Sequence, residues 1–275
     1  MKRNFNIKLI AVDLDGTLLD NDGKISSRVK DAVHRVREKG VEVTLATGRT
    51  FLSAKPFAAD LGINLPLITY MGALVRYSDS DRVLYERCVP SDLAQEVIKA
   101  AGERGYPINF YLDDCVLVKE LTPQNIEYAR KYNVVVKEVG DLSKVSHISP
   151  IKLLIINEDE EEMDKFEREC REAFGRYLHI TKSMPEFLEF SHPEATKAKG
   201  LEAVAEHLGL KREEIMAIGD SYNDLEMLQY AGFAVVMGNA REEIKKYADY
   251  VTTSNEDDGV AEALEKFILN KEAGI

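Results

Sequence analysis

The chain has 275 residues, of which 45% are hydrophobic and 31% charged, and its formal net charge at pH 7 is −12. This apolar content suffices for a packed core and excludes a disordered chain, and the acidity excludes a global attraction to nucleic-acid backbones or anionic membranes. The cysteines Cys88, Cys115 and Cys170 are too widely spaced for a disulfide framework, and the longest uncharged stretch, 61–75, is too short to span a bilayer. We therefore expect a cytoplasmic protein without nucleic-acid or membrane partners.

The beginning of the chain alternates between apolar runs and a helical pattern. Residues 7–12 form a short apolar run that stops at Asp13, as expected for a buried strand. Hydrophobic residues at helical spacing follow over 25–36, Gly40 ends that pattern, and 41–46 is again typical of a strand. This order predicts a βαβ unit with parallel strands.

The middle of the chain has a different character. A helical pattern at 93–101 is followed by an alternating strand pair at 108–119, a strong strand at 151–156 and an acidic segment that leads into a second helix. Beyond this portion the alternation of helix and strand returns. We therefore predict an α/β fold. A doubly wound, mostly parallel, Rossmann-like core sheet is expected from 1–84 and 191–275, with an α+β domain, 85–190, inserted between the two halves.

Polar side chains cluster where three of the predicted core strands end. The clusters are Asp13 with Asp15, Thr47 with Gly48, and Asp220 with Asn223 and Asp224. In an open α/β sheet, ligands bind at the carboxyl edge of the strands, so these residues can converge although they are far apart in the sequence.

Crowded carboxylates repel one another unless a cation lies among them, and hard oxygen ligands favour Mg²⁺. Such an ion, helped by Lys199 and Arg49, would supply an acidic chain with the local positive charge that an anionic substrate requires. A calcium loop that begins at Asp13 would need a glutamate at its twelfth position, where this chain has Lys24.

The spacing of Asp13 and Asp15 suits acid–base and nucleophilic chemistry. In extended backbone, residues two apart project to the same side, and Gly16 then allows a tight turn. One carboxylate can attack phosphorus while the other protonates the leaving oxygen and then activates water.

Four segments of the chain resemble the four motifs of the haloacid dehalogenase-like superfamily, most closely its Cof-like subgroup of sugar-phosphate phosphatases. They are Asp-Leu-Asp-Gly-Thr-Leu-Leu-Asp at 13–20, Ala-Thr-Gly-Arg at 46–49, Lys-Gly at 199–200, and Gly-Asp-Ser-Tyr-Asn-Asp-Leu-Glu-Met-Leu at 219–228. The inserted domain has the size and position of that subgroup's α+β cap. A departure is Met71, which stands where the family often has asparagine.

The resemblance implies a role for each motif residue. Asp13 would be the nucleophile, and Asp15 the general acid/base that also binds the metal through its backbone carbonyl. Lys199 would neutralise charge on the nucleophile; Lys197 is a nearby competitor, and the glycine and helix that follow favour Lys199. The implied phosphate contacts are Leu14, Thr47, Gly48, Lys199 and Asn223. The implied Mg²⁺ contacts are Asp13, Asp15, Asp220 and Asp224, the last of which would orient metal-bound water.

The predicted activity is hydrolysis of a small phosphorylated metabolite, a sugar phosphate, through an aspartyl-phosphate. Two alternatives remain open: a phosphosugar mutase on the same scaffold, and a non-enzymatic phosphosugar-binding protein. The cap would close over the site and choose the leaving group. The candidate residues for contacting the leaving group are Phe110, Tyr111, Asp113 and the segment 184–187.

Overall fold

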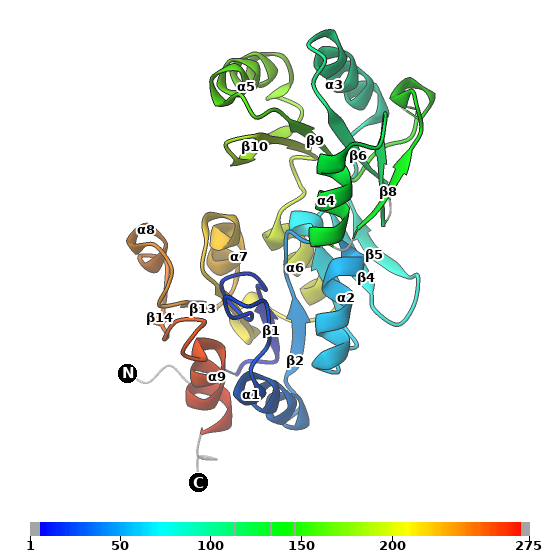
Figure 1. Ribbon diagram of the computed structural model, residues 1–275. Coiled ribbons are helices and arrows are strands. Elements are labelled where there is room, and N and C mark those ends of the chain that lie inside the picture. Colours follow the sequence, from blue (N-terminus) through cyan, green and yellow to red (C-terminus); the bar gives the residue numbers. More distant parts are fainter. Residues whose placement is uncertain (1–5, 113, 133, 146, 271–275) are drawn as a thin grey trace. The chain divides into compact units, whose positions relative to one another are not determined.

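The computed structural model describes residues 6–112, 114–132, 134–145 and 147–270 (Figure 1). The chain forms two compact units: Met1–Tyr85 together with Thr196–Ile275, which we call the core unit, and Glu86–Ala195, which we call the cap unit. Among the described residues, no helix is long and apolar enough to cross a membrane.

The core unit is built on a parallel sheet with the strand order β14-β13-β12-β1-β2. Its strands are β1 (Leu9–Val12), β2 (Glu42–Leu45), β12 (Ile215–Gly219), β13 (Phe233–Val236) and β14 (Tyr250–Val251). Every residue of β1 is buried, which explains why its sequence is continuously apolar. β1 lies between β2 and β12, so strands from the two ends of the chain are neighbours. The predicted doubly wound α/β fold is confirmed.

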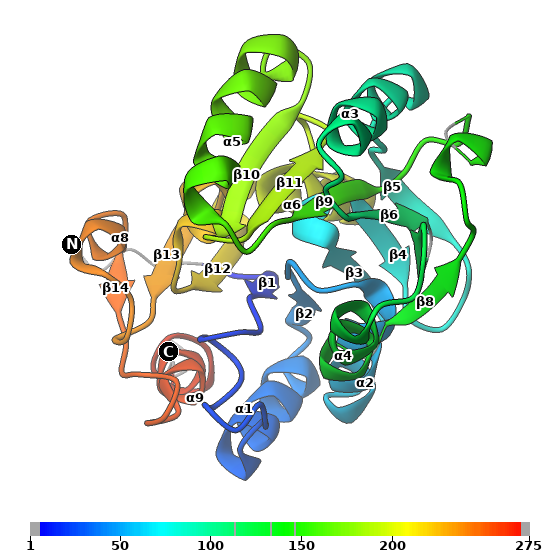
Figure 2. The same ribbon diagram turned by 45° about the horizontal axis from the view of Figure 1, so that its top comes forward.

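Helices cover this sheet. They are α1 (Ser27–Glu38), α2 (Phe51–Asp60), α6 (Lys197–Leu208), α7 (Leu225–Tyr230), α8 (Glu242–Lys245) and α9 (Gly259–Leu264). The Ser26 side chain caps α1 by accepting a hydrogen bond from the Val29 amide. Leu201 and Val204 of α6 and Met227 of α7 belong to the same buried hydrophobic cluster as Leu9 of β1. Figure 2 shows α1 and α9 side by side.

A smaller three-stranded sheet adjoins the core strands. It consists of β3 (Pro66–Thr69), β4 (Leu74–Tyr77) and β5 (Val83–Glu86), and the short helix η1 (Tyr70–Gly72) joins β3 to β4. A single bridge between Ala46 and Ile68 connects β3 to the end of β2. η1 therefore lies close to the carboxyl edge of the main sheet.

The cap unit has a six-stranded sheet with the order β10-β11-β9-β6-β7-β8 and helices α3 (Ser91–Glu103), α4 (Pro123–Tyr132) and α5 (Glu160–Phe174). The strands are β6 (Ile108–Leu112), β7 (Cys115–Val118), β8 (Val135–Glu138), β9 (Lys152–Ile156), β10 (His179–Met184) and β11 (Phe187–Ser191). Neighbouring strands are antiparallel except for β7 and β8. The inserted sheet-containing cap is thus confirmed, although α4 and β8 were not expected from the sequence.

The hydrophobic core of the cap unit lies between its sheet and the two helices α3 and α5. Val97 of α3 and Phe166 of α5 pack with Phe110 of β6. Phe110 is fully buried in this cluster, so it is unsuited to the substrate contact that the sequence suggested. Asp113, another candidate for that role, lies outside the described residues.

Candidate active site

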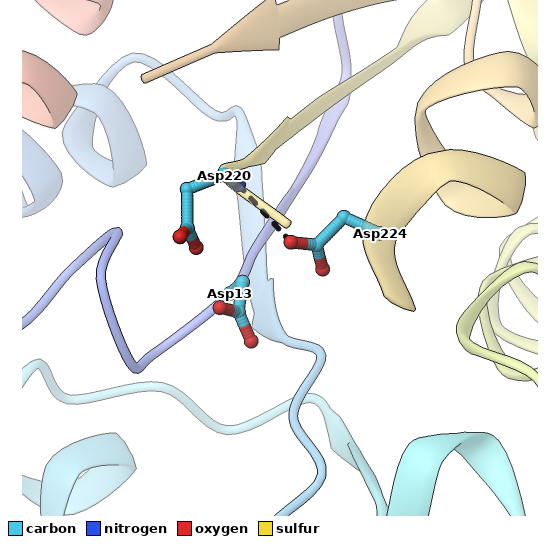
Figure 3. Close-up of side chains that lie close together, drawn as sticks. All are labelled: Asp13, Asp220 and Asp224. Atoms are coloured by element: carbon cyan, nitrogen blue, oxygen red, sulfur yellow. Dashed lines mark hydrogen bonds between the residues drawn. The ribbon is translucent and has the colours of Figure 1, made fainter. Parts of the chain in front are cut away.

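Three aspartates converge at the carboxyl edge of the core sheet. Asp13 follows β1 and Asp220 follows the adjacent strand β12, and the Asp13 amide donates a hydrogen bond to the Ile218 carbonyl (3.0 Å). Asp224 comes from the short helix η4 (Tyr222–Asp224), which begins just beyond β12. Figure 3 shows the three carboxylates facing a common space, and each offers an oxygen within 4.8 Å of the others. The sequence-predicted convergence of these three residues is present in the structure.

Hydrogen bonds around this cluster hold two of the carboxylates in place. One Asp224 oxygen, Oδ2, accepts a hydrogen bond from the Asp220 amide (3.0 Å, Figure 3) and a second from the Ser221 amide (3.0 Å). The Thr17 hydroxyl donates a hydrogen bond to Asp220 Oδ1 (3.0 Å). Gly16 has φ +78°, and a Cβ there would lie 2.7 Å from Asp220 Oδ2. A side chain at position 16 would therefore displace the Asp220 carboxylate.

A buried lysine bridges the cluster, and it is Lys197. Its ammonium donates hydrogen bonds to Asp13 Oδ1 and Asp224 Oδ1, both 2.6 Å long, and its side chain is only 1% exposed. Lys199, which the sequence analysis preferred, contacts Glu202 instead (2.7 Å), and its side chain is 46% exposed. The prediction that Lys199 lies beside Asp13, the predicted nucleophile, is therefore wrong, and Lys197 occupies that place.

The physical reason is helix geometry. The Thr196 side chain caps α6, so Lys197 is the first helical residue, and Lys199 is rotated from it by about 200° around the axis. Lys197 shares a face with Gly200, Leu201 and Val204, which are buried. Gly200, Leu201 and Val204 follow Lys197 by three, four and seven residues. This helical spacing is visible in the sequence and identifies Lys197 as the inward-facing lysine.

Burial and charge set the protonation of this cluster. The pKa of Asp13 is raised to about 8, mainly by burial and also by the neighbouring Asp224 and Asp220, against the opposing effect of Lys197. Burial likewise raises the pKa of Asp220 to about 6. Burial acts to lower the pKa of Lys197, but Asp13 and Asp224 outweigh this effect, so that pKa lies above its usual value and the lysine stays charged.

These residues fit a divalent cation. With all groups ionised, three carboxylates and one ammonium leave an excess of two negative charges in a largely buried space. Oxygen ligands at this density suit a hard cation such as Mg²⁺. A divalent ion would neutralise the excess and favour the charged form of each aspartate. The aspartate cluster is therefore consistent with divalent metal binding.

Asp15 lies apart from the three clustered carboxylates. Its carboxylate accepts hydrogen bonds from Arg49 Nε (2.8 Å) and from a terminal Arg49 nitrogen (2.6 Å), and its side chain is 59% exposed. This bidentate contact fixes the orientation of an exposed carboxylate that lies two residues after Asp13 in the sequence. Arg49 therefore touches the predicted acid/base group directly, a contact that sequence reasoning did not assign.

The predicted phosphate contacts occupy several positions around the cluster. Thr47 is buried, and its hydroxyl oxygen accepts a hydrogen bond from the Arg49 amide (3.1 Å) while its hydroxyl proton remains available to donate. The Leu14 side chain is buried, and its carbonyl begins the turn that follows β1. Asn223 is exposed and accepts a hydrogen bond from the Ser221 hydroxyl.

The turn η1 joins the second motif to the lysine helix. Its amides reach back to the Thr47–Arg49 segment: Tyr70 donates to the Arg49 carbonyl (2.9 Å) and Met71 to the Thr47 carbonyl (3.1 Å). Tyr70 and Met71 have φ of 51° and 58°, a left-handed conformation that costs such residues energy and that the surrounding structure must maintain. In the sequence, Met71 is distinguished only by its departure from the family pattern.

Gly72 completes this turn and is expected to control the position of Lys197. It has φ +97°, and a Cβ there would lie 2.0 Å from the Thr196 carbonyl at the start of α6. Gly72→Ala should therefore displace the first turn of α6, lower the thermal unfolding temperature and reduce turnover at this site by more than tenfold.

The matched control is Gly23→Ala. Gly23 also has positive φ (+75°), but nothing lies within 4 Å of the added Cβ, so only backbone strain of about 1 kcal/mol is expected. Calorimetry and activity assays of both variants check this prediction. Equal effects of the two substitutions on activity would show that contact with α6 is unimportant.

The fold and the site together define a class: a doubly wound α/β core with an acidic, lysine-bridged centre at the carboxyl edge of its sheet and an inserted cap. Comparison with protein families gives the narrower result. The family of haloacid dehalogenase-like hydrolases matches residues 10–264, and the chain belongs to this family. The resemblance drawn from the four motifs is thereby confirmed.

Individual relatives agree with this assignment. The chain is 33% identical to the 5-amino-6-(5-phospho-D-ribitylamino)uracil phosphatase YcsE of Bacillus subtilis, with 98% of each chain covered. A solved structure from Thermotoga maritima is 30% identical, with a TM-score of 0.87 and coverage of 94% of this chain and 97% of that one. The structure of a sugar phosphatase of subclass IIB of the haloacid dehalogenase (HAD) superfamily is 25% identical, with a TM-score of 0.79 and coverage of 94% of this chain and 98% of that one. The protein is a phosphatase of the HAD superfamily that acts on small phosphorylated metabolites.

Proposed function

We propose that this phosphatase is Mg²⁺-dependent and hydrolyses a sugar phosphate through an aspartyl-phosphate on Asp13. The observation that carries the proposal is the contact of the buried Lys197 ammonium with both Asp13 and Asp224, beside the third carboxylate of Asp220. This arrangement holds a carboxylate nucleophile in one orientation within a site that attracts a divalent cation.

Each residue of the site would have a distinct role in the reaction. The Asp13 carboxylate attacks phosphorus as the bond to the leaving oxygen breaks, and Asp15 gives its proton to that oxygen. Asp15 then removes a proton from the water that attacks the phosphorus of the aspartyl-phosphate, which releases phosphate and restores Asp13. Lys197 orients Asp13 and offsets charge on the phosphoryl group, while Thr47, Gly48, Leu14 and Asn223 would contact its oxygens.

Mg²⁺ would be held by Asp13, Asp220 and the Asp15 backbone carbonyl, with Asp224 beside them. When bound, it supplies positive charge that stabilises the transferring phosphoryl group. Both oxygens of Asp224 already accept hydrogen bonds, from Lys197 and from the backbone at 220–221. We therefore assign to Asp224 the positioning of Lys197 and of the loop that carries Asp220.

The likeness to a sugar phosphatase supports a phosphorylated sugar as substrate. The relative from Bacillus subtilis is named for a substrate in which a phosphorylated ribityl chain is joined to a pyrimidine. Both compounds present a phosphate monoester on a polyhydroxylated carbon chain, so we propose this feature for the substrate of the present protein. The rest of the leaving group would be selected by the cap.

Phosphate release from p-nitrophenyl phosphate, measured with Mg²⁺ and again with EDTA, tests the metal dependence. We expect release with Mg²⁺, a fall to background with EDTA, and recovery when excess Mg²⁺ is added. A panel of sugar phosphates and polyol phosphates then tests the substrate class. Hydrolysis that persists in EDTA would contradict the metal assignment, and conversion of one sugar phosphate into an isomer without phosphate release would indicate a mutase instead.

A further inference from the structure

The turn that follows β1, residues 14–19, contacts side chains from two loops near the end of the chain. This turn carries Asp15, the predicted acid/base group, whose backbone carbonyl is also a predicted metal ligand. Within the turn, the Leu14 carbonyl accepts a hydrogen bond from the Leu19 amide (2.9 Å). Gly16 has φ +78°, and glycine gives a turn more conformational freedom than any other residue. Contacts from outside the turn are therefore needed to fix one backbone geometry.

Two asparagines supply these contacts. Asn239 Nδ2 donates a hydrogen bond to the Gly16 carbonyl (2.8 Å), and Asn255 Nδ2 donates one to the Leu19 carbonyl (2.9 Å). The Asn255 amide also donates to Asn239 Oδ1 (3.1 Å), so the two asparagines are bonded to each other. We call Asn239 and Asn255 the asparagine clamp. It holds two carbonyls of one turn through a single connected set of hydrogen bonds.

The clamp comes from two core strands that supply none of the three clustered carboxylates. Asn239 follows β13 and Asn255 follows β14, so both lie at the carboxyl edge of the sheet, as the aspartate cluster does. The two loops pack directly together: the Gly238 amide donates to the Thr253 carbonyl (2.9 Å), and a Cβ at Gly238 would lie 2.9 Å from the Thr252 carbonyl. A side chain at position 238 would therefore push the two loops apart.

The clamped turn also contacts the aspartate cluster. The Thr17 hydroxyl donates to Asp220, and the position of a Cβ on Gly16 lies 2.7 Å from the same carboxylate. A displaced Gly16 peptide would therefore disturb both Asp220 and the backbone next to Asp15. Asn239 is exposed, and one exposed hydrogen bond contributes little to folding, so its contact with Gly16 matters chiefly for the geometry of the turn.

We propose that the asparagine clamp positions this turn for catalysis: by holding the Gly16 and Leu19 carbonyls, it fixes the backbone that carries the Asp15 carbonyl and carboxylate. This role of the clamp depends on the proposed function, in which Asp15 is the acid/base group and a metal ligand. Asn239 and Asn255 are not among the predicted phosphate or metal contacts, so they act through the turn. Their loss should weaken Mg²⁺ binding and slow turnover while leaving substrate binding nearly unchanged.

Asn239→Leu removes both clamp bonds of Asn239 with a side chain of similar size. We expect isothermal titration calorimetry to show Mg²⁺ binding weakened about tenfold, since loss of a group that orients a metal ligand costs roughly 10–100-fold in affinity or activity. At saturating Mg²⁺, kcat for p-nitrophenyl phosphate should stay roughly tenfold below the wild-type value, while KM changes by less than about twofold. A role in folding alone would lower the thermal unfolding temperature and leave these constants unchanged.

Asn239→Asp tests the bond to Gly16 by itself, and it also serves if Asn239→Leu does not fold. It keeps the oxygen that accepts from the Asn255 amide and loses only the donor to the Gly16 carbonyl. A carboxylate oxygen facing a carbonyl oxygen is repelled, so the turn should shift. We therefore expect kcat to fall as it does in Asn239→Leu.

The matched control is Lys39→Met. Lys39 Nζ also donates to two carbonyls of a distant segment, those of Leu269 (2.7 Å) and Ile268 (3.2 Å). Lys39 precedes β2, however, and so lies at the amino edge of the sheet, opposite the aspartate cluster. Its substitution should lower the unfolding temperature without changing Mg²⁺ binding or kcat.

The outcomes separate the clamp from the proposed function. Wild-type Mg²⁺ affinity and kcat in both Asn239 variants would overturn the role of the clamp and leave the proposed function standing. Equal losses in Lys39→Met would also overturn that role, because any lost contact between distant segments would then impair the site. A wild-type chain that neither binds Mg²⁺ nor hydrolyses p-nitrophenyl phosphate would overturn the proposed function and the role of the clamp together.

Discussion

Replacing Asp13 by asparagine is expected to reduce turnover of p-nitrophenyl phosphate by at least roughly 10⁴-fold, the scale seen when a covalent nucleophile is removed. An amide of the same shape cannot form the acyl phosphate. The fold should be retained, because Lys197 keeps its second contact with Asp224 and the substitution removes one of three crowded carboxylates. Thermal unfolding of the metal-free variant should therefore occur at or above the wild-type temperature.

Asp22→Asn is the matched control for this experiment. Asp22 has a side chain that is 78% exposed and pairs weakly with Lys24 at 3.5 Å, so its substitution should change neither turnover nor stability. Mass spectrometry of the wild-type enzyme during turnover should also detect a phosphoryl adduct on the peptide that contains Asp13. Ordinary hydrolysis by Asp13→Asn would remove Asp13 from the nucleophile's role.

The second large effect is expected at Lys197, with Lys199 as an internal control on the same helix. Lys197→Met should lower kcat by about 10²–10³-fold, because it removes a positive charge that is prearranged beside the reacting carboxylate. It also leaves Asp13 and Asp224 buried without their counter-charge, and removal of one partner from a buried ion pair costs about 3–5 kcal/mol. Lys199→Met removes an exposed pair with Glu202 and should change stability by less than about 1 kcal/mol.

Steady-state kinetics and chemical denaturation of both variants check this comparison. If Lys197→Met does not fold, Lys197→Gln at saturating Mg²⁺ provides the same test, because bound metal offsets the charge excess. A larger loss of activity in Lys199→Met than in Lys197→Met would restore the original assignment. Similar small losses in both would mean that neither ammonium acts on the phosphoryl group.

The family and the acidic centre could be predicted from the sequence because each depends on local order. An apolar run that ends in Asp13-Leu14-Asp15-Gly16 specifies a buried strand followed by a tight turn, and the same logic places Asp220 after β12. Parallel strands of one sheet present their carboxyl ends at one edge, so the convergence of Asp13 and Asp220 follows from topology. Local pattern and the resemblance to known motifs therefore sufficed for the fold class and the carboxylate cluster.

Other features depended on contacts between distant segments. The choice between Lys197 and Lys199 required the start of α6, which Thr196 fixes by capping the helix, and the shift of two positions turns a side chain from the interior to the solvent. The contact of Arg49 with Asp15 and the left-handed turn at Tyr70–Gly72 likewise follow from packing between segments that are not adjacent in sequence.

The sequence by itself determined the α/β core, the inserted cap and the aspartates that gather at the sheet edge, since hydrophobic periodicity and strand-end motifs are local properties. Only the tertiary structure decided which lysine enters the site and which arginine orients Asp15. Both depend on the direction of a side chain and on the atoms that surround it, and these are set by long-range packing rather than by neighbours in the chain.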